Sequence, residues 1–422
     1  MLALLLALLP LQAESDLTPL FDGQTLAGWV TRGERYDGAA DWRVEDGCIV
    51  GSQGAKGEGG LLYTEKSYTS FELRLDVQLD TPFDSGVFLR MVPASENQKG
   101  AQVTLDWRAD GEIGAIYADG FLQHNEAAKA KFRGDAWNDV RVRCTGFDMH
   151  LQVWLNGECI TDFRHAPADP FEFAPRGKLG IQVHGERGDT GAARFRKLRL
   201  VELPIFADDF GADGAVRSDV RGWQALLAPG QSTLDGFSIA GDPRGYQLAD
   251  GVLSILGNRE GGHIFTNEDY QDFELRFDFR LAPMANSGLF LRAARDGSNP
   301  AFSGCEVQIL DDFNWERVTG TKLKPWQFTG SLYGSVPPGD RSALRPLGEW
   351  NIYEVLYRGS RLAVALNGRT LYDVNTLALT PEQGEPFTKR AARGFIGIQS
   401  HGAEQPTPEP MVAFRRFFLR PL

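Results

Sequence analysis

The chain has 422 residues, of which 42% are hydrophobic and 24% charged, as is ordinary for a soluble globular protein. This length is enough for two or three domains that each bury a core. The formal net charge of −12 argues against a nucleic-acid backbone as ligand, since such proteins need basic patches. No Walker loop or dinucleotide fingerprint is present, and the 48 Gly, 27 Phe and 9 Trp favour strands and turns.

The first segment, residues 1–13, is a run of Leu and Ala that ends in Leu11-Gln12-Ala13. It is too short to span a bilayer and has the small-residue ending of a signal-peptide core, although the usual basic beginning is missing. The alternative is a hydrophobic N-terminal strand. We therefore expect a secreted or periplasmic protein that is cleaved near Ala13 and has no membrane span.

Residues 17–203, which we name copy one, predict many short strands of alternating polarity separated by Gly, Asp and Asn turns. Asn156-Gly157 is a strong hairpin signal, because type I′ turns need positive φ. A helix is expected over residues 126–132. Strands are expected at residues 42–49, 60–64, 68–79, 84–90, 137–142, 153–155, 177–184 and 195–200.

The same order of segments returns in residues 204–422, which we name copy two, with a boundary near Leu203-Pro204. The tandem duplication predicts two all-β domains of ordinary size, each an antiparallel β-sandwich. A second helix is expected over residues 381–392. The equivalent segments are 60–64 and 262–266, 68–76 and 270–278, 84–90 and 286–292, 137–138 and 350–351, 156–157 and 367–368, and 177–185 and 394–402.

Two strands of copy two carry polar side chains at alternating positions. Phe290 and Arg292 share one face of residues 285–292, and Glu306 and Gln308 share one face of residues 304–312, because successive side chains point to opposite sides. Burying such groups without partners is costly. They therefore predict a polar surface on one face of a sheet, the alternative being a structural ion pair between Arg292 and Glu306.

The ordered segments resemble the 3-keto-disaccharide hydrolase domain family, which has a concanavalin-like jelly-roll sandwich. The resemblance covers nearly the whole chain after the first segment, once in each copy. It rests on Phe-Asp-Gly…Leu-x-Gly-Trp (in copy one only, residues 21–29), Trp-x-Val-x-Asp-Gly, Asn-Ser-Gly-x-Phe-x-Arg, Gly-x-Glu-x-Gln-Ile-x-Asp, Trp-Asn, Asn-Gly and Gly-x-Ile/Leu-x-x-Gln-x-His-Gly. Copy two carries the polar motif as Asn286-Ser287-Gly288, Arg292, Glu306, Gln308, Asp311 and His401.

Copy one departs from this motif at two positions. Asp84 stands where copy two has Asn286, and either Gln102 or Ala101, depending on the alignment, stands where copy two has Glu306. The residues that remain are Arg90, Gln182 and His184. We therefore expect copy two to hold the competent site and copy one to assist in binding or structure.

The resemblance implies action on a carbohydrate that is oxidised to a ketone at C3. Such a carbonyl acidifies the hydrogen at C2, so that a base can remove it, the C1 leaving group is expelled and water adds back. The base would be His401 or Glu306. The enolate would be stabilised by Arg292 or by a bound divalent cation.

Further site residues follow from the same motif. Asn286, Gln308 and Gln399 are expected to bind the substrate, and Trp315 and Trp326 lie in a loop longer than that of copy one, where they would stack on a sugar ring. The sequence identifies no cofactor with certainty; the candidate is a divalent metal cation, which would find a mixed oxygen and nitrogen ligand set. That set is Glu306, Asp311 and His401, and it needs a bulge or strand end at Leu310, since a regular strand points the two carboxylates to opposite faces.

Each of these residues also has a structural alternative. His401 and Gln399 would then make strand-end hydrogen bonds, and Trp315 and Trp326 would pin their loop to the body. The competing functions are a conventional two-carboxylate glycosidase and a non-catalytic carbohydrate-binding module.

The remaining aromatic and thiol side chains are expected to be structural. The Trp residues that recur with the fold, Trp29, Trp42, Trp137 and Trp350, are expected in the core. Cys144 and Cys159 flank a predicted hairpin and would either pair or stay buried thiols, and the four cysteines together do not make a disulfide-dense scaffold.

Overall fold

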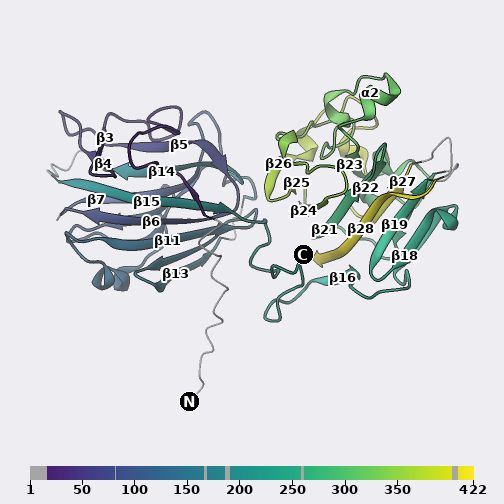
Figure 1. Cartoon of the computed structure of the whole chain (residues 1–422), viewed down its shortest axis with the longest axis horizontal. Helices are drawn as coiled ribbons and strands as arrows, with labels where there is room; N and C mark the ends of the chain where they lie inside the picture. The colour runs from purple at the N-terminus through teal and green to yellow at the C-terminus, as the bar shows by residue number, and fades with distance from the viewer. Residues whose placement is uncertain (1–16, 81, 166–168, 186–190, 258–260, 402–406) are drawn as a thin grey trace, which may run out of the picture. The chain divides into compact units, whose positions relative to one another are not determined.

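The computed structural model describes residues 17–80, 82–165, 169–185, 191–257, 261–401 and 407–422. The signal segment predicted at residues 1–13 therefore lies outside the described residues. The chain divides into two compact units, Met1–Leu203 with copy one and Pro204–Leu422 with copy two. Figure 1 shows that both are built almost wholly of strands. Each is a sandwich of two antiparallel sheets, which confirms the predicted all-β fold class.

Copy one packs an eight-stranded sheet on a seven-stranded sheet. The order of the larger is β13-β12-β11-β6-β15-β4-β3, with β1 paired to β15, and that of the smaller is β10-β9-β8-β7-β14-β5-β2. The strands are β1 Thr18–Pro19, β2 Trp29–Val30, β3 Asp41–Glu45, β4 Cys48–Ser52, β5 Gly60–Tyr68, β6 Phe71–Leu79, β7 Asp84–Met91, β8 Ala101–Asp106, β9 Ile113–Tyr117, β10 Phe121–Gln123, β11 Asn138–Thr145, β12 His150–Leu155, β13 Glu158–Arg164, β14 Gly177–Val183 and β15 Ala192–Glu202.

Copy two repeats this plan with an eight-stranded and a five-stranded sheet. The larger has the order β18-β19-β28-β21-β24-β25-β26, with β16 paired to β28, and the smaller β17-β20-β27-β22-β23. The strands are β16 Gln224–Leu227, β17 Phe237–Gly241, β18 Tyr246–Ala249, β19 Val252–Gly257, β20 Gly262–Thr266, β21 Phe273–Leu281, β22 Asn286–Ala293, β23 Cys305–Leu310, β24 Trp350–Arg358, β25 Arg361–Leu366, β26 Arg369–Asn375, β27 Phe395–Ser400 and β28 Thr407–Pro421.

Helical segments are short and lie in the connections. The predicted helix of copy one appears as the 3₁₀ helix η2 Glu126–Lys131, whereas the one expected at residues 381–392 is reduced to the single turn η7 Phe387–Lys389. The others are η3 Pro243–Gly245, α1 Pro300–Ser303, α2 Trp315–Thr319, η4 Pro325–Gln327, η5 Arg341–Ala343 and η6 Thr376–Ala378. Among the described residues, no helix combines the length and apolar character needed to cross a bilayer.

The alternation of the strands creates the core. Val87 and Leu89 of β7 and Val103 and Leu105 of β8 point into the core of copy one. Leu289, Leu291, Val307, Ile309 and Ile398 do the same in copy two. The intervening side chains of these strands lie on the opposite face of the smaller sheet, because the side-chain period of a strand is two residues. We name this outward face the site face of each copy.

Hairpin turns follow the sequence signals. Asn156 and Asn367 have φ of 51° and are followed by Gly157 at 85° and Gly368 at 79°, as two-residue type I′ turns require. They join β12 to β13 and β25 to β26. This confirms both predicted hairpins and places the neighbouring strands in register.

The expected core positions of the tryptophans are confirmed only in part, and of the two alternatives for Cys144 and Cys159 the unpaired thiols are found. Trp29 is buried, but Trp137 and Trp350 are only half-buried; Arg196 stacks on Trp137 (3.9 Å) and Arg415 on Trp350 (4.0 Å). Guanidinium groups therefore cover these two rings at the surface. All four cysteines are free thiols; Cys144 is buried and Cys159 exposed, so the pair does not form a disulfide.

Candidate functional site

The site face of copy two is organised around Glu306. Glu306 on β23 lies directly opposite Phe290 on β22, and Gln308 lies opposite Gly288. A Cβ on Gly288 would come within 2.0 Å of Glu306 Oε1, so this glycine makes room for the carboxyl group. The side chain of Glu306 therefore occupies the space above Gly288, where β22 has no side chain.

The carboxyl of Glu306 is almost completely buried, with 3% of the residue exposed. Phe290 packs with Ala301 and Phe395 on the same face, and Phe265 and Phe302 cover this group. No hydrogen bond or ion pair joins the carboxyl to another of the described residues. Desolvation alone raises the pKa of Glu306 to about 8. The group is consequently protonated at neutral pH and can donate a proton.

Gln399 and His401 approach the same place from β27. The pairing of Leu289 with Ile398 puts Gln399 beside Gly288, on the side away from β23. Ser287 Oγ donates to Gln399 O (2.6 Å) and fixes the two strands together. Asn286 and Gln399 are half-buried and His401 is exposed at the end of the strand. The register therefore brings Glu306, Gln399, Asn286 and His401 to one end of the site face.

Gln308 contributes differently from the prediction. It is buried, and its Oε1 accepts a hydrogen bond from the backbone N–H of Ile309 (3.0 Å). Its carbonyl accepts from Gly330 N (2.9 Å) and from the hydroxyl of Tyr353 (2.9 Å). The residue thus helps to attach the loop after β23 to the edge of the sheet.

Arg292 does not lie on the site face, in contrast to the prediction from strand alternation. Its φ is 52°, and the pairing of β22 with β27 shifts between Phe290 and Ala293, so the side chain turns towards the larger sheet. The guanidinium lies 3.4 Å from the ring of Tyr357 and donates to Gly359 O at 2.7 Å. It also donates to Gln271 O and to Asp272 Oδ1.

Arg90 of copy one makes the same kind of structural contact. Its φ is also 52°, and it is fully buried. It donates to Thr69 O (2.8 Å), Gly146 O (2.7 Å) and Phe147 O (3.4 Å). In both copies the arginine of the repeated motif ties the end of a strand to two loops, and its hydrogen bonds point away from the site face.

Asp311 does not join Glu306 and His401 in a metal site. Its Oδ1 accepts from the backbone N–H groups of Phe313 and Asn314, both at 3.1 Å. Its Oδ2 accepts from Met284 N (2.8 Å) and from the side-chain amide of Asn314 (2.9 Å). The described residues contain no group of three or more His, Cys, Asp and Glu side chains placed to hold a metal ion. The predicted ligand set therefore does not fit a metal.

The two tryptophans of the long loop have different surroundings. Trp326 is buried, donates from Nε1 to Glu382 Oε2 (2.9 Å) and packs edge-on against Tyr333 (5.1 Å between centroids). It therefore pins the loop, as the structural alternative anticipated. Trp315 in α2 is half-buried and stays a candidate for sugar contact. Tyr333, whose N–H donates to Glu306 O (2.9 Å), was not singled out from the sequence.

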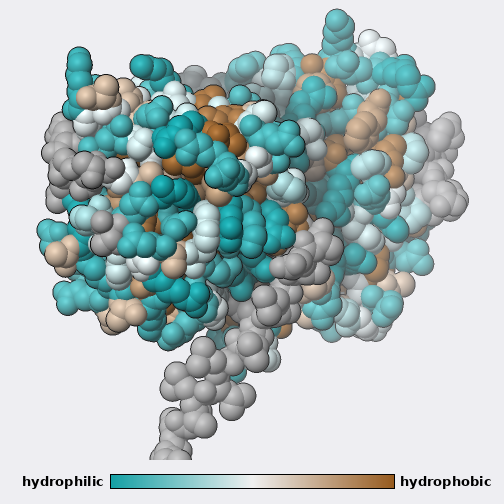
Figure 2. Space-filling view, turned by 60° about the vertical axis from the view of Figure 1, so that its left-hand side comes forward, coloured by the Kyte–Doolittle hydropathy of each residue, from teal (hydrophilic) through white to brown (hydrophobic). Residues whose placement is uncertain are grey.

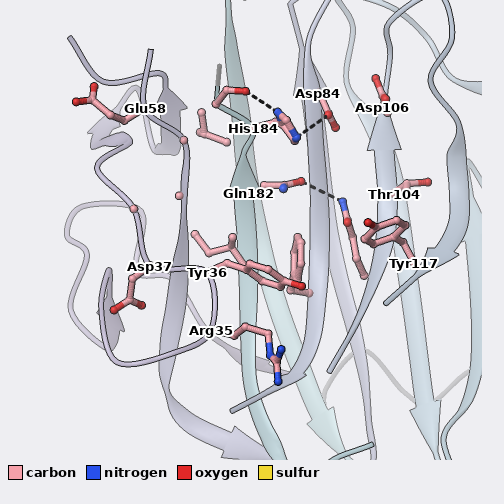
Figure 3. A pocket seen from close by; sticks show the side chains of 18 of the residues that line it. Arg35, Tyr36, Asp37, Glu58, Asp84, Thr104, Asp106, Tyr117, Gln182 and His184 are labelled. Carbon is pink, nitrogen blue, oxygen red and sulfur yellow. Dashed lines mark hydrogen bonds and ion pairs between the residues drawn. The ribbon is translucent and has the colours of Figure 1, made fainter. Parts of the chain in front are cut away.

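Copy one carries a cavity of about 1100 Å³ on its own site face. Register settles which residues are equivalent: Phe88 lies opposite Gln102, as Phe290 lies opposite Glu306, so Gln102 and not Ala101 replaces the glutamate. Figure 3 shows the side chains of Asp84, Gln182 and His184 gathered in this cavity, with the rings of Tyr36 and Tyr117 beside them.

Polar contacts hold the floor of this cavity. Gln102 Nε2 donates to Gln182 Oε1 (3.0 Å), above Gly86, which leaves the space for the amide. Arg108 bridges Asp84 (2.7 Å) and Asp106 (2.5 Å). These contacts hold two amide groups and two carboxylates in place on the site face.

The histidine of the cavity has two oxygen neighbours. His184 Nδ1 is 2.8 Å from Gly185 O, and Nε2 is 3.9 Å from Asp84 Oδ2. A proton on Nδ1 suits the carbonyl, and a proton on Nε2 suits the carboxylate.

The acid and the amide have exchanged places between the copies: copy one has Asp84 and Gln102 where copy two has Asn286 and Glu306.

The fold and the two site faces define a class: a tandem β-sandwich protein in which the outward face of each smaller sheet carries glutamine, histidine and carboxyl side chains. Comparison with known proteins agrees with this class. A sequence profile of the 3-keto-alpha-glucoside-1,2-lyase-like domain matches residues 16–201 and 222–420. The chain belongs to this family, once in each copy, which confirms the resemblance noted in the sequence.

Individual relatives cover about half of the chain. A 3-keto-disaccharide hydrolase of Bacteroides thetaiotaomicron is 33% identical over 237 residues, or 48% of this chain and 77% of that protein. Two structures of candidate glycosyl hydrolases from Parabacteroides distasonis are 24% and 26% identical, with TM-scores of 0.40 and 0.39. Each covers 48% of this chain, and 100% and 94% of the respective structure.

Proposed function

We propose that this protein is a secreted or periplasmic enzyme that cleaves 3-keto-glycosides, with its reaction centre on the site face of copy two. The family and the relative that is a 3-keto-disaccharide hydrolase support the substrate class. The observation that carries the choice of centre is the buried carboxyl of Glu306 with its pKa of about 8. A general acid needs such a pKa, close to the working pH.

The proposed reaction is an elimination followed by hydration. His401, exposed at the strand end, takes the proton from C2, which the C3 ketone has acidified. The electron pair of the C2–H bond forms the C1=C2 double bond, and the C1–O bond breaks. The leaving oxygen receives the proton of Glu306, so the alcohol departs neutral. The hydroxyl of a water molecule then adds to C1 and its remaining proton goes to the Glu306 carboxylate, while His401 returns its proton to C2; this completes a net hydrolysis and restores both groups.

The remaining residues would bind the sugar. Gln399 and Asn286 offer amide donors and acceptors to hydroxyl groups beside the carboxyl, and Trp315 offers a ring at the loop. The buried position of Glu306 keeps water from its proton until the leaving oxygen arrives. No step requires the guanidinium of Arg292 or the carboxylate of Asp311, since both are engaged by the loops of copy two.

The test is release of methanol from methyl 3-keto-glucoside by the purified full chain, beside the unoxidised glucoside, because an alkoxide leaving group needs the proton of a general acid. We expect turnover of the 3-keto substrate alone, and a rate lower by about 10²- to 10⁴-fold in Glu306→Gln, the range for loss of one general acid. Glu385→Gln, the same change at an exposed position of copy two, is the matched control. Equal turnover of the unoxidised glucoside would indicate a conventional glycosidase.

Two further results would overturn parts of the proposal. A folded wild type that binds sugars but cleaves no 3-keto-glycoside would be a binding module. Cleavage abolished by Asp84→Asn and not by Glu306→Gln would move the centre to copy one. Addition of EDTA tests for a divalent cation: a lasting loss of turnover, restored by metal, would require ligands other than the predicted three.

A further inference from the structure

The cavity of copy one is large for a small-molecule site. Its volume of about 1100 Å³ exceeds the range of about 300–1,000 Å³ that is usual for small-molecule sites. The floor is formed by β7, β8, β9 and β14, and the rim by the loops at residues 32–39, 56–60 and 108–112. A space of this size accommodates more than one sugar ring.

The amide pair at its floor presents a donor and an acceptor side by side. Because Gln102 Nε2 donates to Gln182 Oε1 (3.0 Å), Gln182 keeps its Nε2 donors and Gln102 keeps its Oε1 acceptor. Neither atom has a partner among the described residues, and Gln102 is only 8% exposed. An adjacent donor and acceptor match a pair of neighbouring hydroxyl groups, each of which donates and accepts.

Aromatic rings stand at the mouth of the cavity. Phe121 is 47% exposed and lies edge-on to Tyr117 (5.4 Å) and stacked on His124 (4.3 Å). Tyr36 lies edge-on to Phe88 (5.7 Å) and donates its hydroxyl proton to Asp119 (2.7 Å). Phe121 therefore offers an exposed ring at the edge of the cavity, next to the ring of Tyr117. The flat apolar face of a pyranose ring is a ligand that such rings can cover.

The charges around the cavity select against acidic ligands. Seven carboxylates line it, against four guanidinium and ammonium groups. The excess of negative charge repels uronates and phosphates, whereas the carboxylates accept hydrogen bonds from neutral hydroxyl groups. In Figure 2 the surface of copy one that comes forward is mainly hydrophilic, with small separate hydrophobic areas.

We propose that the cavity of copy one is a separate binding site for neutral, unoxidised oligosaccharides of hexopyranose units. It holds the sugar without cleaving it, because the amide of Gln102 stands where copy two has the acid Glu306 and cannot give up a proton to a leaving oxygen. This binding proposal and the proposed cleavage at copy two have only the chemical class of the ligand, a carbohydrate, in common. Copy one would then keep the enzyme on a glycan while copy two acts on oxidised units.

The experiment measures binding of maltotriose and cellotriose to the full-length Glu306→Gln protein by calorimetry and saturation-transfer NMR, with trigalacturonate as the acidic probe. We expect binding of at least one neutral trisaccharide and none of trigalacturonate. Gln182→Ala should weaken it about tenfold through lost hydrogen bonds, and Phe121→Ala about fivefold through lost ring contact. Leu377→Ala, at a similarly exposed apolar residue, should leave the affinity unchanged.

The outcomes separate this proposal from the proposed function. No binding of either neutral trisaccharide, or unchanged affinity in both Gln182→Ala and Phe121→Ala, overturns the proposal even if the wild type cleaves 3-keto-glycosides. Trigalacturonate bound as tightly as the neutral sugars overturns the charge argument. Because Phe121 is at the surface, its variant remains informative if Gln182→Ala fails to fold.

Discussion

Replacing Glu306 by Gln should stabilise copy two while it removes activity. The pKa of Glu306 is about 8 in the folded protein, against an ordinary value of 4.5 for a glutamate side chain in water. Between these two pH values the folded state holds a proton that the unfolded state has lost. The stability contributed by the neutral carboxyl is therefore complete below pH 4.5 and is lost as the pH rises through 8.

The size of the effect follows from the shift. Each pH unit in this window lowers the free energy of unfolding by about 1.4 kcal/mol, so the wild type at pH 7 should be less stable than Glu306→Gln by about 3 kcal/mol, an order-of-magnitude figure. At pH 4 the two proteins should be alike. A gain in stability from loss of a functional acid is the expected trade-off at a strained site.

Scanning calorimetry at several pH values is the assay, since two compact units should give separable transitions. Glu306→Gln should shift one transition upward at pH 8 and hardly at pH 4.5. Gln102→Glu, which places a carboxyl over Gly86 in copy one, is the matched reverse change and should lower the other transition as the pH rises. A Glu306→Gln shift that is equal at both pH values, or destabilising at pH 8, would refute the desolvation argument.

Three further outcomes are expected. The rate of 3-keto-glycoside cleavage should fall as the pH rises through about 8, because Glu306 loses the proton that it donates; a flat pH–rate profile to pH 9.5 would speak against this role. The double change Asp84→Asn with Gln102→Glu gives copy one the acid and the amide of copy two. In the Glu306→Gln background this double change should restore part of the cleavage activity. A folded protein that recovers no activity would show that exchanging these two residues is insufficient for catalysis. Arg292→Leu should destabilise copy two by about 3 kcal/mol, since it removes a buried donor from three loop acceptors. Arg90→Leu should destabilise copy one in the same way. Denaturant titration measures both changes, and a loss of stability of less than about 1 kcal/mol would contradict the tethering role.

The fold was predictable because its signals are local and repeated. Alternating polarity marks the strands, Asn-Gly marks two hairpins, and the second occurrence of the same order identifies the duplication. The tryptophans show the limit of this reasoning. Trp137 and Trp350 are large apolar side chains of the kind found in cores, but an arginine from two strands away in the same sheet covers each ring instead, and no sequence spacing reveals a contact between such distant segments.

The candidate site was predictable where strands stay regular. Alternation placed Glu306 on the outward face and Asp311 on the other side, as observed. Alternation predicted the wrong face for Arg292. The positive φ of this residue turns its side chain away from the site face, and the sequence contains no signal for that backbone conformation at an arginine. The cavity of copy one was missed for a different reason: its rim comes from loops such as that with Tyr36, whose position is set by distant contacts.

The strand that closes each larger sheet has a consequence for synthesis of the protein. β15 lies between β6 and β4, and β28 lies between β21 and β19, so each copy receives a central strand after all its other strands have been made. Copy one can complete its sandwich at Glu202 while the ribosome is still producing copy two. The larger sheet of copy two remains in two parts until β28 emerges. A nonsense codon anywhere between β27 and β28 would therefore leave a finished first sandwich joined to a second that exposes two open edges, a substrate for aggregation and proteolysis.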